Sequence, residues 1–305
     1  MYRYALSRLA SAIPTLLVVI AMAFFLTRAA PGGPFDAERR LPDAIEARLE
    51  QAYHLDEPLW QQFVRYIGGL VKGDFGPSFR YHDVDVGTLI AQGLPVSLLL
   101  GSLALALALI IGLPAGAMAA LNHNRWPDRA LVGTSLIGLS LPNFVVAPLL
   151  VLVFAVTLRW LPAGDLGGPA HWVLPVIALA LPQIAYVTRL IRGELLDVLG
   201  SGFVRTARAQ GLGDATILAR HALRPALLPL ISYLGPASAS LLTGAVVVEQ
   251  IFGLPGLGRF FVQGAINRDY TLVLGVVVLY STLIIVFNLI VDLLYGWLDP
   301  RVRYR

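Results

Sequence analysis

The chain contains no cysteine, which excludes disulfide bonds, thiol nucleophiles and sulfur-ligated metals. It has no GxxxxGKS or GxxxxGKT phosphate-binding loop, so the sequence assigns no ATP hydrolysis to it. Its five histidines lack HExxH or comparable ligand spacing, and no GxSxG nucleophile motif occurs. The sequence therefore predicts a protein that is not an enzyme and that itself binds no metal and no cofactor.

Charged residues are scarce, at 14% of the chain, whereas hydrophobic residues make up 57%. Apolar windows near the ~20 residues that cross a bilayer recur along the sequence. Because lipid cannot satisfy backbone polar groups, each window is expected to be a helix. The sequence thus predicts an all-α, polytopic membrane protein with six transmembrane helices. The six windows are 9–27, 94–121, 130–158, 172–191, 226–251 and 273–294.

The arginines are distributed asymmetrically about these windows. If both termini lie in the cytoplasm, twelve arginines fall in cytoplasmic segments and only three in the two short outer loops. The long outer segment 28–93 mixes acidic and basic residues and contains two expected amphipathic helices, at 41–53 and 58–70. We therefore divide the chain into a tail with the first helix (1–27), an extracytoplasmic loop subdomain (28–93) and a transmembrane core (94–305).

The first window also needs to be weighed as a secretory signal. Its apolar run is longer than the roughly 7–15 residues of a signal-peptide core, and Pro31 closely follows the small residues that would form a cleavage site. We therefore expect this helix to remain as an uncleaved anchor.

An arginine-rich segment, 203–229, separates two of the apolar windows. Helix-favouring residues run to Gln210, Gly211 then breaks the helix, and Asp214 is a good N-cap for a second short helix. Pro225 suits the first turn of the next membrane helix. A short helix, a hinge and rigid anchoring at both ends are what an element that transmits force requires.

This segment reads RTARAQG at 205–211 and HALRP at 221–225. It resembles the EAA loop of permease subunits in ATP-binding-cassette importers, in the variant typical of peptide and nickel permeases. Arg205 stands where the usual motif has Glu, and Thr206 stands where it has Ala. Ala207 and Gly211 match the motif.

Further stretches extend the resemblance over essentially the whole chain. The sequence VEQIFGLPGLG at 248–258, with NRDY at 267–270, is similar to the peptide/nickel branch of this family. The stretches IPT at 13–15, PGGP at 31–34 and GDFGPS at 73–78 are also family-like. The chain is thereby identified as a member of the binding-protein-dependent permease family, most like the B-type subunits of oligopeptide permeases.

The resemblance implies the type I fold of ABC importer permeases, with this chain forming half of a translocation pore for oligopeptides or dipeptides. It implies three kinds of protein partner: a homologous second permease, two cytoplasmic ATP-binding subunits that use ATP and Mg, and an extracytoplasmic solute-binding protein. It also implies a bacterial cytoplasmic (inner) membrane location with both termini inside. The coupling loop, 192–225, would dock on the ATPases. Its candidate residues are Arg205, Thr206, Ala207, Arg208, Gly211, His221, Arg224 and Pro225.

The glycine-rich turn after the fifth window is a second candidate site. We expect it at the outer mouth of the pore, where it would help close the path or meet the binding protein; a purely structural turn is the alternative. Closely placed glycines and a proline suit a tight turn whose backbone approaches another group. The candidate residues here are Glu249, Gly253, Pro255, Gly256, Gly258 and Asp269.

Polar residues within the windows are candidates for lining the path, although hydrogen bonding between helices explains them equally. These residues are Asn143, Gln183, Tyr186 and Asn288.

Other functions remain open on the sequence. A stand-alone secondary transporter would show two related halves, and we find no internal repeat. A receptor or structural membrane protein has no need for the coupling-loop pattern. Nickel, glutathione or another small solute remains an alternative cargo to peptides. The net charge of +4 reflects membrane topology, because no basic face with interleaved aromatic residues suggests nucleic-acid binding.

Overall fold

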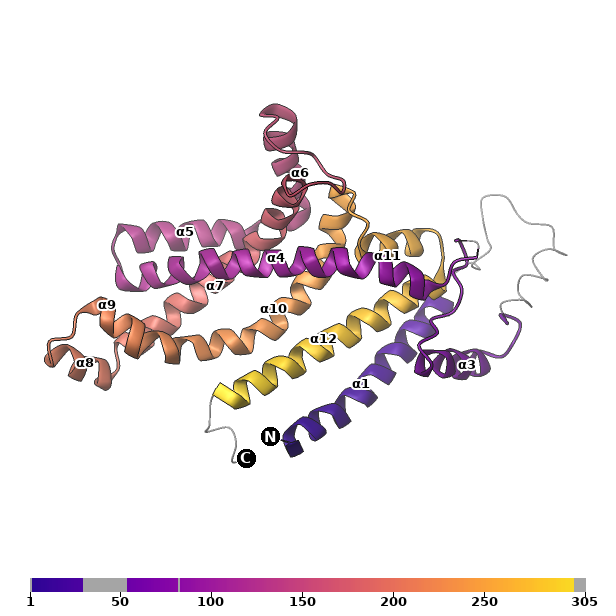
Figure 1. Ribbon diagram of the computed structural model, residues 1–305, viewed down its shortest axis with the longest axis horizontal. Coiled ribbons are helices and arrows are strands. Elements are labelled where there is room, and N and C mark those ends of the chain that lie inside the picture. Colours follow the sequence, from indigo (N-terminus) through magenta and orange to yellow (C-terminus); the bar gives the residue numbers. More distant parts are fainter. Residues whose placement is uncertain (1, 30–53, 82, 299–305) are drawn as a thin grey trace.

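A computed structural model describes residues 2–29, 54–81 and 83–298, and helices dominate it (Figure 1). No strand occurs among these residues; one isolated bridge joins Pro77 to Asp85. The all-α prediction is confirmed. The helices are α1 (Tyr2–Ala29), α3 (Leu59–Val71), α4 (Val86–Leu121), α5 (Trp126–Ser140), α6 (Asn143–Leu150), the π-helix η1 (Val151–Thr157), α7 (Ala170–Leu199), α8 (Gly202–Ala209), α9 (Asp214–Ile217), the π-helix η2 (Leu218–Ala222), α10 (Leu223–Phe252), α11 (Leu257–Ile266) and α12 (Tyr270–Leu298).

The long helices run roughly along one axis of the molecule (Figure 1). Helices α4 and α7 share the most extensive contact, because Gly116 leaves no side chain between them; a Cβ there would lie 2.6 Å from the carbonyl oxygen of Thr188. Helix α12 lies between α10 and α1 (Figure 1). The short helices α8 and α9 lie at one end of the bundle, which we call the α8 end, and α3 and α11 lie at the other, the α3 end.

Within the described part of the chain, five helices are long and apolar enough to cross a membrane, and a sixth candidate exists if the pair α5 and α6–η1 counts as one span. The prediction of one continuous helix over 130–158 is wrong, since this pair bends by 102°. Pro142 explains the break: it disfavours helical geometry at the residue before it, and Leu141 accordingly has a ψ of 118°.

The segment expected at 58–70 is confirmed as α3, and one face of it packs on α1. The rings of Phe24, Phe25 and Phe63 form a cluster with centroid distances of 5.2–5.6 Å. Helix α4 begins at Val86, earlier than the predicted 94, so part of the expected loop subdomain is helix. The expected helix at 41–53 lies outside the described residues.

Candidate functional site

The α8–α9 loop is an exposed helical hairpin resting on a small apolar cluster at the α8 end. Val204 and Ala207 lie on one face of α8 and are buried against Ile217 of α9. The helix ends at Ala209, and Gly211, whose φ of +83° suits glycine, follows its cap; the amide of Leu212 donates to the carbonyl of Ala207 at 3.2 Å. The predicted helix and glycine break are confirmed.

The rest of the α8 surface is exposed and combines basic and apolar groups. Phe203 is 50% exposed, and Arg205 and Arg208 are exposed elsewhere around the helix. Leu212 adds a further exposed apolar side chain. Large exposed apolar groups mixed with arginine are typical of protein interfaces. This surface, made by Phe203, Arg205, Arg208 and Leu212, is the α8 face.

Several details of this loop differ from the sequence expectation. Asp214 is the first residue of α9, not its cap, and Gly213 precedes it in extended geometry. The Ala207 side chain is buried in the cluster with Ile217, so it supports α8 and is not part of the exposed α8 face. Thr206 donates to the carbonyl of its own helix at Gly202.

Pro225 lies in the first turn of α10, as predicted, and is exposed, as is Arg224. His221 is half-buried in η2, the π-helical turn that joins α9 to α10 without a break. Proline has no amide hydrogen for the carbonyl four residues earlier, and a widened turn directly before it accommodates this loss.

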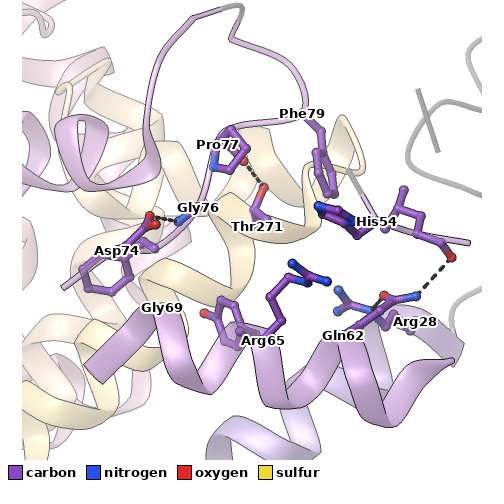
Figure 2. A pocket seen from close by; sticks show the side chains of 13 residues that line it. Arg28, His54, Gln62, Arg65, Gly69, Asp74, Gly76, Pro77, Phe79 and Thr271 are labelled. Atoms are coloured by element: carbon purple, nitrogen blue, oxygen red, sulfur yellow. Dashed lines mark hydrogen bonds between the residues drawn. The ribbon is translucent and has the colours of Figure 1, made fainter. Parts of the chain in front are cut away.

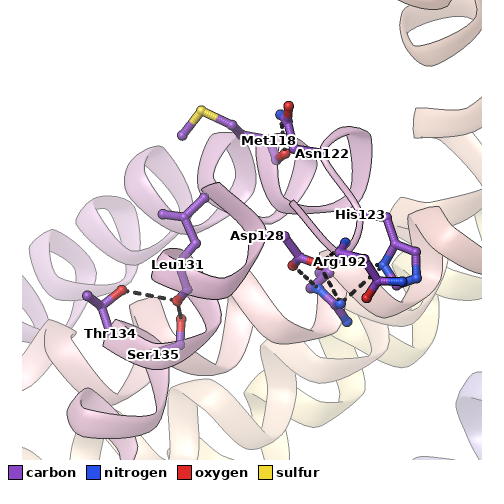
Figure 3. A network of polar contacts seen from close by, with 9 residues as sticks. Met118, Asn122, His123, Asp128, Leu131, Thr134, Ser135 and Arg192 are labelled. Atoms are coloured by element: carbon purple, nitrogen blue, oxygen red, sulfur yellow. Dashed lines mark hydrogen bonds and ion pairs between the residues drawn. The ribbon is translucent and has the colours of Figure 1, made fainter. Parts of the chain in front are cut away.

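A buried ion pair fixes the neighbouring loop at the α8 end (Figure 3). Arg192 of α7 donates through Nε and Nη2 to the two carboxylate oxygens of Asp128 of α5, at 2.5 and 2.8 Å. The amide of Asn124 also donates to Asp128, and His123 lies 3.3 Å from Arg192. This bidentate pair joins α7 to the α4–α5 connection just before the α8–α9 loop. The sequence interpretation missed it, because the partners are far apart in the chain.

The glycine-rich turn closes around the carboxylate of Glu249, which is fully buried. Ser97 of α4 donates to Oε1 at 2.6 Å, and the amide of Gly258 donates to Oε2 at 2.7 Å. The hydroxyl of Ser97 in turn accepts from the amide of Leu257 at 2.9 Å. The carboxylate thus joins α4, α10 and the start of α11, and we call this arrangement the Glu249 lock.

The glycines of this turn have different roles. Gly256 has a φ of −94°, so its need for glycine comes from space: a Cβ would lie 2.3 Å from the Glu249 carboxylate carbon. Positive φ occurs instead at Gly253, which ends α10 with a φ of +67°. Pro255 lies between these two glycines in the turn.

Asp269 is a second buried carboxylate at the α3 end. It accepts from the Ser78 hydroxyl and, at 3.2 Å each, from the amides of Phe79 and Leu272. The hydroxyl of Thr271 donates to the carbonyl of Pro77 at 2.7 Å. These contacts bring the GDFGPS and NRDY stretches together at the start of α12, so Asp269 has a structural contact that the sequence did not reveal.

The four expected path-lining residues do not converge on one surface. The Gln183 side chain joins α7 to α10, accepting from the Tyr233 hydroxyl at 2.5 Å and donating to Ser240 at 3.2 Å. Tyr186 stacks on Tyr233 with a centroid distance of 3.9 Å and is 41% exposed. Of these four residues, Tyr186 is the one whose side chain is exposed.

The remaining two residues lie apart from that pair. Asn143 begins α6, and its buried Oδ1 has no hydrogen-bond partner among the described residues. Asn288 donates to its own helix and lines a small cavity between α1 and α12, beside the Arg8–Asp292 ion pair. A cavity of about 360 Å³, lined by Ser97, Ser102, Ser238 and Phe287 among others, opens between α4, α10 and α12. Sequence reasoning named none of the residues lining it.

The fold and these contacts define a polytopic α-helical membrane protein of the transport-permease class. The family model described as "Binding-protein-dependent transport system inner membrane component" matches residues 112–304. The chain belongs to this family.

Named relatives align with this chain over essentially its full length. The chain is 51% identical to the oligopeptide transport system permease protein OppB of Haemophilus influenzae and 50% identical to OppB of Salmonella typhimurium, with 100% of each chain covered. It is 42% identical to the dipeptide transport system permease protein DppB of Bacillus subtilis, over 99% of this chain and 98% of the relative. The fold is similar to a chain of the MetNI methionine ABC transporter in an inward-facing conformation, with a TM-score of 0.61 and 18% identity over 69% of this chain and 96% of that one.

Proposed function

We propose that this chain is one pore-forming subunit of an ATP-driven importer of oligopeptides or dipeptides. A homologous permease supplies the other half of the pore, and two cytoplasmic ATP-binding subunits, which use ATP and Mg, supply the energy. A solute-binding protein delivers the cargo from outside. Closure of the ATPase subunits on ATP pushes the α8–α9 loop, and the two half-pores rock between outward and inward openings. Each state requires different contacts, because a ligand without differential affinity shifts no equilibrium.

The α8 face carries this proposal. It offers exposed Phe203 and two arginines on a helix that Val204 and Ala207 fix to α9. The chain continues without a break from α9 into α10, so a displacement of the loop is transmitted to a membrane helix. The Asp128–Arg192 pair stiffens the neighbouring end of α7, from which α8 starts.

We infer that the α8 end is cytoplasmic and that the protein lies in the bacterial inner membrane. The arginine asymmetry supports this orientation. The natural chain has no cysteine, so single cysteines report sidedness without background. A maleimide that does not cross membranes should label Phe203→Cys only from the cytoplasmic side and Lys72→Cys only from outside. Labelling of both from one side contradicts the topology.

Peptides are the cargo that the relatives support best. Full-length relatives at 42–51% identity are named for oligopeptide or dipeptide transport. Copurification of the transporter in mild detergent, followed by titration of its binding protein with peptides, glutathione and nickel, tests this assignment. Peptide binding with stimulated ATPase activity is expected; stimulation by nickel or glutathione alone contradicts it.

A further inference from the structure

A cavity with two arginines and one aspartate, Asp74, in its lining lies at the α3 end, between α1, α3 and the start of α12 (Figure 2). Its volume is about 240 Å³. The side chains of Arg28 and Arg65 point toward the same space, with His54 and Gln62 beside them. None of the motifs discussed above includes these side chains.

Arg28 has an N–H group for which the described residues provide no hydrogen-bond acceptor. Its Nε donates to Gln62 at 2.9 Å, and its guanidinium lies 3.5 Å above the ring of Phe24. Its Nη1 is buried and has no hydrogen-bond partner in the described part of the chain, and the same holds for the hydroxyl of Tyr66. Arg65, by contrast, is paired with Glu57 at 2.6 Å. A buried charged donor without a partner is costly, and a bound anion would offset that cost.

The position of Arg28 along the membrane helix α1 indicates which kind of anion it meets. It lies in the last turn of α1, at the end of the candidate span Ala10–Ala29. The end of a membrane helix lies at the level of the lipid headgroups, where arginine meets phosphate. The planar guanidinium matches a phosphodiester with two parallel hydrogen bonds.

The outer face of α3 provides a second, independent observation. Trp60, Val64 and Val71 share one face of the helix and are 62%, 61% and 83% exposed. Helix α1 is likewise apolar and exposed at Met22 and Leu26. An amphipathic helix with an exposed tryptophan, next to a lipid-facing helix, is typical of an element lying in the membrane interface.

We propose that α3 lies in the lipid headgroup layer and that the cavity binds the phosphodiester of one phospholipid through Arg28 and Tyr66. The apolar face of α3, which begins at Trp60, contacts the acyl chains. The bound lipid fixes α3 against α1 next to the loop that Asp269 holds. This inference does not depend on the cargo or on the ATPase partners.

Native mass spectrometry of the complete transporter, titrated with phosphatidylglycerol in mild detergent, tests the site. Wild type should retain one phospholipid more than Arg28→Gln, whose occupancy at equal lipid should be at least about 5-fold lower. Lys72→Gln, which removes an exposed basic residue outside the cavity, should bind as wild type does. Equal lipid occupancy in wild type and Arg28→Gln overturns the proposal. Displacement of the lipid by excess inorganic phosphate shows an ion site and overturns it as well.

A second measurement keeps the test valid if Arg28→Gln does not assemble. In vesicles containing phospholipids brominated in the acyl chains, the wild-type transporter should lose more tryptophan fluorescence than Trp60→Tyr. Equal quenching of the two proteins contradicts placement of α3 in the bilayer. Loss of that difference when the solute-binding protein is added assigns the α3 face to the protein partner and likewise overturns the lipid proposal.

Discussion

The α8–α9 loop and the Glu249 lock are both glycine-containing turns between helices, yet they are built in opposite ways. The loop places Phe203 and its arginines outside and rests on three buried side chains. The lock places a carboxylate at 0% exposure and surrounds it with donors from α4 and α11. An exposed face on a small support is suited to bind a partner, whereas a buried polar network is suited to hold helices in register.

This difference separates two kinds of effect in mutants. Changes in the lock should act mainly on stability, because they leave buried polar groups unpaired or overfill the turn. Changes on the α8 face should act mainly on ATPase association and coupling, because the side chains there contact little of their own chain. The following predictions test that separation.

Gly256→Val should have the largest effect. The new Cβ would meet the Glu249 carboxylate at 2.3 Å, so we expect a destabilisation of roughly 3 kcal/mol and a large fall in the yield of assembled complex. Thermal unfolding of the purified complex measures it. Gly168→Val is the matched control, since nothing lies within 4 Å of a Cβ at that position. A stable Gly256→Val complex with normal yield refutes the lock.

Asp128→Asn should follow in magnitude. It removes a charge partner from Arg192, which donates two hydrogen bonds to that carboxylate and is only 25% exposed. We expect a loss of about 2 kcal/mol, measured by the same unfolding assay. Asp214→Asn provides the control, because its partner Arg208 and Asp214 itself are 49% and 72% exposed. That exposed pair should contribute no more than ~0.5 kcal/mol. Equal losses in the two variants contradict the distinction between the pairs.

Gly211→Val should cost about 1–2 kcal/mol, because valine is strained at a φ of +83°. Since Gly211 turns the chain directly after α8, the α8 face should be displaced, and stimulated ATPase activity should fall more than complex stability does. Gly213→Val, at a φ of −70° with nothing within 4 Å of its Cβ, should retain both properties. Loss of activity in both variants to the same degree shows that backbone geometry at Gly211 is not the cause.

Phe203→Ala should change the stability of the permease least, within ~0.5 kcal/mol, because half of the side chain is exposed. It should nevertheless weaken association with the ATPase subunits about 10-fold, a loss typical of a central aromatic contact. Pull-down of the ATPase subunits at graded concentrations measures this effect. Unchanged association would remove Phe203 from the interface.

Local signals in the sequence predicted the helices well. The apolar windows and the glycine at 211 are properties of neighbouring residues, and the structure confirms the helices and the break that they indicate. The membrane topology and the coupling role of the loop stay predictions. The 102° bend at Pro142 was not predictable, because proline marks a break without fixing its angle.

Long-range polar contacts account for most of what the sequence did not reveal. Ser97 and Glu249 are 152 residues apart, and Asp128 and Arg192 are 64 apart. Neither pairing follows from local spacing, since only the packing of helices brings the partners together. For the same reason, Gln183 could be named from its position in a window, but its bonds to Tyr233 and Ser240 could not.

Site-directed crosslinking tests the central claim most directly. The chain contains no cysteine, so Phe203→Cys and Leu257→Cys each place one thiol, on the α8 face and beside the fully buried lock respectively. In the assembled transporter, a thiol-attached photocrosslinker should join Phe203→Cys to an ATPase subunit, while Leu257→Cys should remain unmodified until the complex is denatured. Crosslinking at 257 with none at 203 would contradict the assignment of the α8 face as the surface that receives the ATPase.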